Sequence, residues 1–77
     1  MILPNKLISF QDCILSKTVY ILEEIIDSDF SVIRLYEQVE IHFEDISEYM
    51  LALDVLYVLG KIKYNEELQA IQYVEKN

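Results

Sequence analysis

The 77-residue chain contains few of the residues on which common catalytic and cofactor sites depend. It has one glycine, one proline, one cysteine, one histidine and no tryptophan. A single glycine rules out a glycine-rich phosphate-binding loop in this sequence, and a single cysteine rules out an internal disulfide. One histidine, His42, gives no convincing catalytic triad. We therefore expect a protein that is not an enzyme and that binds no cofactor.

Positive charge is also scarce. Six lysine and arginine residues face fourteen acidic ones, which gives a net charge of −8, and Arg34 is the only arginine. Contacts with nucleic-acid phosphates need clustered lysine and arginine, so no direct binding of nucleic acid is expected. An acidic surface instead favours a basic protein partner.

Long apolar runs are absent as well. None approaches the roughly 20 residues that a membrane-spanning helix needs, so the sequence predicts no membrane span. The opening segment, Met1-Ile2-Leu3-Pro4, is interrupted by proline before the apolar region of a signal peptide develops. These two features predict a cytoplasmic location.

The chain is nevertheless rich in apolar residues for its size. Hydrophobic residues make up 53% of it, and the mean hydropathy is positive. A length of 77 residues allows a single domain (residues 1–77), which hides only somewhat more than about 60% of the surface of its unfolded chain. Part of the apolar material is therefore expected to form an interface within a hetero-oligomer.

The first half of the chain predicts an extended arm and two helices. Pro4 favours extended backbone over residues 1–9. A first helix is predicted from about residue 11 to 26, capped by Ser9 or Asp12. Its apolar residues recur at helical spacing, and they are Ile14, Leu15, Val19, Leu22 and Ile26. Ser31 is expected to cap a second helix that ends near residue 42.

The second half predicts a third helix and a hairpin. Asp45 has capping-box spacing to Glu48, with Ser47 as a competing cap. Gly60 supplies the left-handed residue that ends this helix. Strands are predicted over residues 61–64 and 68–74, joined by a turn. Three helices followed by a two-stranded hairpin predict a mainly α, winged-helix-like fold of the α+β class.

The third helix is apolar on nearly every side, which predicts two buried faces. Its core face is expected to pack with Ile62 of the first strand, and it comprises Tyr49, Ala52, Leu53 and Leu56. The opposite face lacks the Arg, Lys, Asn or Gln that would read DNA, and it is the predicted protein interface, comprising Met50, Leu51, Asp54, Val55, Tyr57 and Val58. Leu3 and Pro4 of the arm are added to this candidate interface.

Asp54 has two interpretations. It is either a carboxylate wetted on the open side of the helix or the partner of a lysine or arginine on another subunit. Two tyrosines have the same pair of interpretations, since Tyr57 and Tyr73 are either core-edge residues or interface anchors.

Two other groups of residues are candidate sites of chemistry. His42, Glu44 and Asp45 lie in one segment without a second imidazole or a thiolate, so a solvated surface is expected rather than a metal site. Cys13 is predicted to lie inside the first helix with Lys17 one turn away, and a packed thiol is favoured over a nucleophile.

Two segments resemble a known family. They are Met1-Ile2-Leu3-Pro4 with Lys6, and Leu51 to Tyr57 followed by Leu59-Gly60-Lys61-Ile62. This pattern is similar to that of the small middle components of bacterial ABC-three component systems. The resemblance implies an accessory subunit that works beside an SMC- or RecN-like ATPase and an effector in a defence or DNA-surveillance assembly, related more distantly to Lamassu-type antiviral systems.

The sequence therefore favours a non-catalytic adaptor that docks onto an SMC-like ABC ATPase, its effector, or both. Two alternatives stay open. One is a winged-helix regulator that binds DNA as a homodimer, which the charge opposes. The other is an antitoxin-like inhibitor whose acidic cluster of Glu44, Asp45 and Glu48 mimics nucleic acid.

Overall fold

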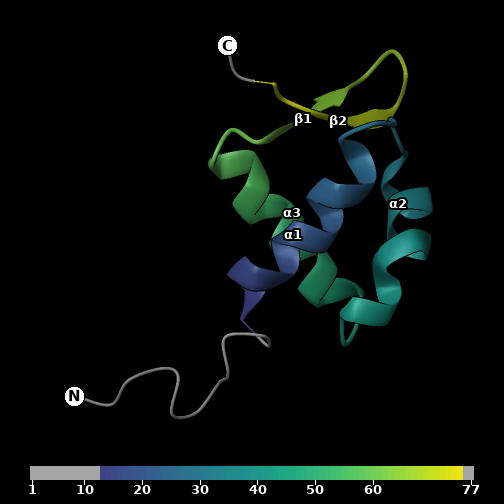
Figure 1. Cartoon of the computed structure of the whole chain (residues 1–77). Coiled ribbons are helices and arrows are strands. Elements are labelled where there is room, and N and C mark those ends of the chain that lie inside the picture. The colour runs from purple at the N-terminus through teal and green to yellow at the C-terminus, as the bar shows by residue number, and fades with distance from the viewer. Residues whose placement is uncertain (1–12, 76–77) are drawn as a thin grey trace.

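The computed structural model describes residues 13–75, which form three α-helices, a 3-10 helix and a two-stranded hairpin (Figure 1). In chain order the elements are α1 (Ile14–Ile25), α2 (Val32–Val39), η3 (Glu40–His42), α3 (Ile46–Val58), β1 (Ile62–Asn65) and β2 (Ala70–Tyr73). This order confirms the predicted winged-helix-like fold, mainly α with a hairpin wing. The predicted arm, with Leu3 and Pro4, lies outside the described residues.

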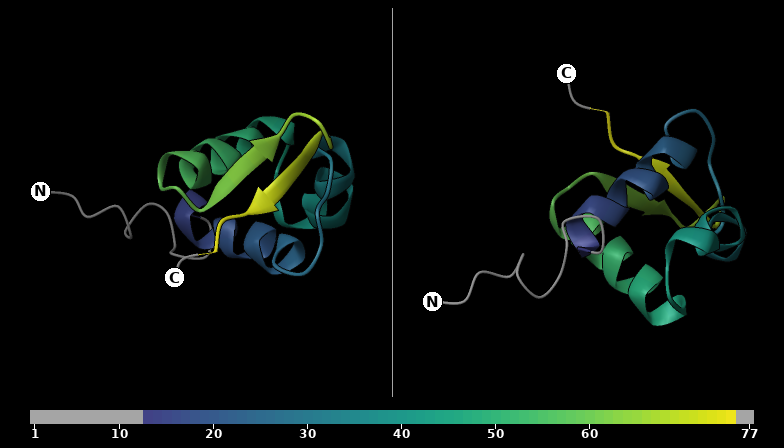
Figure 2. Two further views of the ribbon diagram at one scale, coloured as in Figure 1. Left: turned by 90° about the horizontal axis from the view of Figure 1, so that it is seen from above. Right: turned by 60° about the horizontal axis from the view of Figure 1, so that its bottom comes forward.

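The hairpin is antiparallel, and Ile62 pairs with Tyr73 while Asn65 pairs with Ala70. The view from above in Figure 2 places β1 on the α3 side of the molecule and β2 on the α1 side. The second strand begins at Ala70, two residues later than predicted, because the turn extends to residue 69. At the end of that turn Gln69 has a positive φ of 53°.

Phe30, a single residue between α1 and α2, pairs with the edge of β2 that faces away from β1. The N–H of Ile71 donates to the carbonyl of Phe30 at 2.7 Å, and the N–H of Phe30 donates back at 3.5 Å. This bridge ties the α1–α2 connection to β2. The sequence pattern gave no sign of it, because one residue carries no strand periodicity.

The start of α1 was predicted wrongly. The helix begins at Ile14, with Cys13 at the N-cap position and no side-chain capping bond. Cys13 therefore stands at the helix boundary rather than inside the helix, and the predicted caps Ser9 and Asp12 lie outside the described residues. Ser16 instead turns back, and its Oγ donates to the carbonyl of Cys13 at 2.9 Å.

The other helix ends confirm their predicted signals. Ser31 Oγ accepts the N–H of Arg34 at the start of α2. Asp45 Oδ1 accepts the N–H of Glu48 at 2.9 Å, so Asp45 caps α3, whereas Ser47 lies within the helix. Gly60 follows α3 with a φ of +75°, the left-handed conformation that glycine adopts at least cost.

The core lies where the three helices and the hairpin meet. The predicted core face of α3 is confirmed, since Tyr49, Ala52, Leu53 and Leu56 are all buried, and Ile62 of β1 is buried with them. The remaining buried members of this cluster are Ile21, Ile25, Leu35, Val39, Phe43 and Ile71. The three α-helices and both strands thus contribute to one core, which fixes the orientation of α3.

Helix α1 buries a face that differs from the one whose spacing predicted the helix. Thr18, Ile21 and Ile25 are buried, and Ile14 is packed against the core. By contrast, Leu15, Val19 and Ile26 are exposed, each by about half of its surface. Both sets follow the same helical spacing, shifted by one residue, so α1 has two apolar stripes and the core takes one.

Candidate protein interface on the third helix

The outward face of α3 is apolar and largely open to solvent. Val58 is 81% exposed, Tyr57 is 65% exposed, and Leu51 and Met50 are exposed by about half. Asp54 is also exposed, while Val55 is only half-buried. The sequence therefore placed these residues on the surface correctly, with Val55 at its margin. We call the six residues the α3 face.

One flank of the α3 face borders a groove between α3 and the hairpin. The groove has a volume of about 160 Å³. Met50, Asp54 and Tyr57 line its α3 side, and Lys63 and Tyr64 line its hairpin side. Its remaining lining is apolar and comes from Val32, Leu53, Ile62 and Ile71. A partner side chain inserted here would meet an apolar floor, with the carboxylate of Asp54 on one side and the amine of Lys63 on the other.

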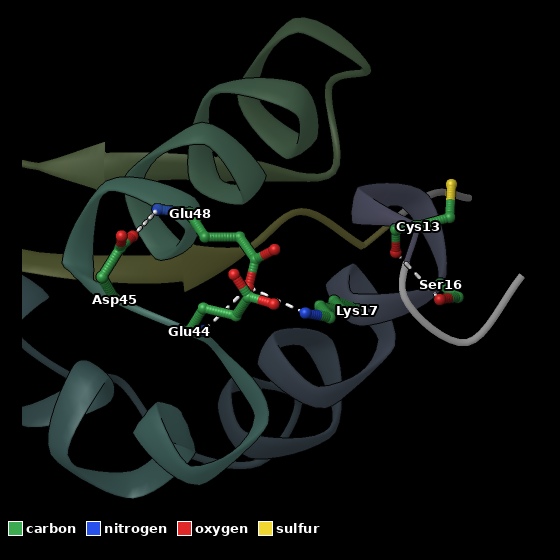
Figure 3. Close-up of polar contacts among 6 residues, drawn as sticks. All are labelled: Cys13, Ser16, Lys17, Glu44, Asp45 and Glu48. Carbon is green, nitrogen blue, oxygen red and sulfur yellow. Dashed lines mark hydrogen bonds and ion pairs between the residues drawn. The ribbon is translucent and has the colours of Figure 1, made fainter. Parts of the chain in front are cut away.

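Fixed contacts hold the first turn of α3 against α1. Lys17 Nζ donates to Glu48 Oε1 at 2.8 Å, across 31 positions of sequence. The same oxygen accepts the backbone N–H of Glu44 at 2.9 Å (Figure 3). The Lys17 side chain is 8% exposed and that of Glu48 is 20% exposed, so water screens the pair incompletely. This pair helps to fix α3 before any partner binds.

The ionisation of Glu48 reflects these contacts. The hydrogen bond from Lys17, followed by that from the Glu44 N–H, lowers the pKa of the Glu48 carboxyl below its ordinary value. A carboxylate stabilised by two donors stays ionised to lower pH than one in water. Glu48 therefore acts as a charged anchor for α3 at neutral pH.

Tyr49 anchors α3 to α2. Its side chain is fully buried, and its hydroxyl donates to the carbonyl of Val32 at 2.7 Å. Burial raises the pKa of this phenol well above its ordinary value. The rings of Tyr36 and Phe43 pack against it at centroid distances of 4.8 Å and 5.8 Å. This cluster joins α3 to α2.

The residues considered as metal ligands or as activators of the thiol make other contacts in the structure. Asp45 caps α3, and the ring of His42 stacks on Tyr20 at a centroid distance of 3.6 Å. No group of potential metal ligands occurs among residues 13–75. Figure 3 shows the Lys17 amine extended toward Glu48 and away from the thiol of Cys13. Lys17 is thus engaged with a carboxylate.

The acidic cluster is largely committed to the fold. Asp45 binds the helix terminus, and Glu48 binds Lys17 and the Glu44 N–H. Two of the three carboxylates that would mimic nucleic-acid phosphates therefore have internal partners.

Within residues 13–75 no helix is long and apolar enough to cross a membrane.

Comparison with protein-family models gives one match that covers most of the chain. Residues 3–71 match the model of ABC-three component (ABC-3C) system Middle Component 7. The chain belongs to this family. No curated protein and no solved structure gave a match. The resemblance inferred from Leu51 to Ile62 and from the opening residues is thereby confirmed.

A middle component of a three-component system works with protein partners, and membership of the Middle Component 7 family gives this chain that general role.

The sequence pattern did not separate the two stripes of α1, so the exposed Leu15, Val19 and Ile26 were missed as surface residues. Their signal was present as a second apolar stripe with the same spacing as the first.

Proposed function

We propose that this Middle Component 7 protein is a non-catalytic adaptor that docks through its α3 face onto the SMC-like ABC ATPase of its system or onto the effector. The observation that carries the proposal is the apolar outward face of α3, on which Leu51, Tyr57 and Val58 are each more than half exposed. Exposed apolar patches on small domains mark sites of protein association. Leu3 and Pro4 extend this proposed interface.

The rigid mounting of α3 supports this role. The Lys17–Glu48 ion pair fixes the first turn of the helix, and buried Tyr49 binds α2. A surface on a rigid helix loses little conformational entropy on binding, which favours affinity. The helix therefore presents the α3 face in one orientation, as an adaptor surface requires.

Charge indicates the chemistry of the partner. Asp54 is exposed amid apolar residues of the α3 face and lines the adjacent groove. We expect it to accept a hydrogen bond from a lysine or arginine of the partner, which is strengthened when the interface excludes water. The net charge of −8 assists the encounter with a basic surface. The adaptor would thereby hold the effector until the ATPase responds to its signal in an anti-phage or anti-plasmid complex.

Co-purification of the tagged chain with the other two components of its system tests the proposal. The test variant is Leu51→Glu with Val58→Glu, because both residues are exposed and central to the α3 face. The matched control is Ile33→Glu with Ile41→Glu, which changes two exposed apolar residues outside α3. We expect the test variant to lose a component that wild type and control retain. Retention by all three proteins would contradict the proposal.

The two other functions make different predictions. A DNA-binding regulator would bind duplex DNA with an affinity that falls steeply as salt rises. A nucleic-acid mimic would lose its target when Glu44 and Asp45 are neutralised and keep it when Leu51 and Val58 are changed.

A further inference from the structure

Helix α1 carries a second apolar surface that residues 13–75 leave exposed. Leu15, Val19 and Ile26 are each about half exposed, and Leu22 between them is partly buried. These positions follow the spacing i, i+4, i+7 and i+11, so they form one stripe along the helix. The stripe extends for about 16 Å, or three turns. We call it the α1 stripe.

The stripe is distinct from the core-facing side of the same helix. The core side holds Thr18, Ile21 and Ile25, each one residue before a member of the stripe. Scattered exposed apolar residues are ordinary, but three that align over three turns, with the partly buried Leu22 between them, form a seam of the kind that packs against another helix. The spacing therefore points to a helical occupant.

The surroundings of the stripe define the charge of that occupant. Glu23 and Asp27 lie four residues apart on its solvent side, and both are exposed. The nearest basic residue on α1 is Lys17, whose amine binds Glu48. The rim of the stripe on α1 is thus acidic. A partner helix with lysine or arginine beside its own apolar seam would complement it.

A second copy of this chain fits the stripe less well. Each copy carries a net charge of −8, and pairing two stripes would bring two acidic rims together. In the pocket beside Ile26, the two carboxylates of Asp27 and Glu75 face the single amine of Lys61. Like charges at an interface oppose association. Charge therefore favours a partner of opposite sign over self-association.

We infer that the α1 stripe is a second docking surface, which binds a basic amphipathic helix from one of the other two components of the system. Together with the α3 face it would allow one small subunit to contact its partners over two neighbouring helices, since α1 packs directly on α3. The inference rests on the proposed adaptor function, to which it adds the second surface and the chemistry of its partner.

Photocrosslinking in the assembled complex tests the inference. A p-benzoylphenylalanine residue replaces Val19, the complex is reconstituted from all three purified components, and the crosslinked peptide is identified by mass spectrometry. We expect a crosslink to a helical segment of the ATPase or effector whose apolar seam is flanked by lysine or arginine. Crosslinks to a second copy, to residues 1–12 of the same chain or to a non-helical segment would overturn the inference.

Affinity measurements with the same components separate the two surfaces. Leu15→Glu with Val19→Glu should weaken binding about tenfold or more, which corresponds to about 1.4 kcal/mol. Glu23→Lys with Asp27→Lys changes only exposed rim residues, so it leaves the fold intact and should also weaken binding. The control Ile33→Glu with Ile41→Glu should stay within about twofold of wild type, as expected for exposed residues outside an interface.

The outcomes distinguish the two claims. If the α1 variants bind normally while Leu51→Glu with Val58→Glu fails, the adaptor function stands and the second surface is wrong. If the α1 variants fail and the α3 variant binds normally, the α1 stripe alone is the docking surface and the α3 proposal is wrong. Loss of binding in both, with circular dichroism unchanged, supports both surfaces.

Discussion

Lys17 donates to Glu48 Oε1 at 2.8 Å and so joins the first turn of α1 to the first turn of α3. Because the pair is partly buried, removal of the cation leaves a carboxylate with one fewer donor in a poorly hydrated place. We expect Lys17→Met to lower the free energy of unfolding by about 1–2 kcal/mol. Urea denaturation measures this change, and an unchanged midpoint would show that the ion pair contributes nothing to stability.

The same pair makes stability depend on pH. The pKa of Glu48 is lower in the folded protein than its ordinary value of 4.5, so the stabilisation is complete above that value. It is lost as pH falls through the folded-state pKa, because the carboxylate must then be protonated. We expect the stability difference between wild type and Glu48→Gln to be largest near pH 7 and to shrink below about pH 4.5. A difference that stays constant between pH 7 and pH 3 would contradict this assignment.

The phenol of Tyr49 is predicted to stabilise the packing of α3 on α2. Tyr49→Phe keeps the ring but removes the hydrogen bond to the Val32 carbonyl, and should cost about 1 kcal/mol. Tyr36→Phe is the matched control, since Tyr36 is the neighbouring ring of the same cluster and no hydrogen bond of its hydroxyl occurs among the described residues. Thermal unfolding should place Tyr49→Phe below Tyr36→Phe, and the reverse order would show that the bond is not stabilising.

The N-terminal cap of α3 gives a prediction with an internal control. Asp45→Ala removes the acceptor of the Glu48 N–H and should destabilise the domain by about 1 kcal/mol. Ser47→Ala, two residues along, should have little effect because Ser47 is an exposed residue within the helix. Chemical denaturation of both variants checks this. Equal losses would mean that the capping bond is not the cause.

Much of the fold was predictable because its signals are local. Asp45, Ser31 and Gly60 stop or start helices through contacts with residues three or four positions away, and such contacts are visible in sequence spacing. The core face of α3 was also predictable, since its apolar residues recur three or four positions apart and so share one side of the helix. The family resemblance was carried by Leu51 to Ile62 of this segment together with the opening residues Met1 to Pro4 and Lys6.

The remaining features depend on tertiary packing. The two stripes of α1 have identical spacing, so only packing against α3, α2 and β2 decides that Ile21 and Ile25 are buried while Val19 and Ile26 are exposed. The bridge between Phe30 and Ile71 joins segments 41 positions apart, and the Lys17–Glu48 pair joins segments 31 positions apart. Neither has a periodic signal in the sequence. The exposed α3 face was identified because its apolar residues exceeded what one core-facing side could use.

The most direct test of the adaptor account is the affinity of purified Leu51→Glu, Val58→Glu protein for each of the other two components, measured by isothermal titration calorimetry. Two buried charges in an apolar interface should weaken binding at least about a hundredfold, which corresponds to about 2.8 kcal/mol. The Ile33→Glu, Ile41→Glu control should bind as tightly as wild type. If the α3 variant, shown by circular dichroism to be folded, binds both components with wild-type affinity, the α3 face is not the docking surface and the central claim is wrong.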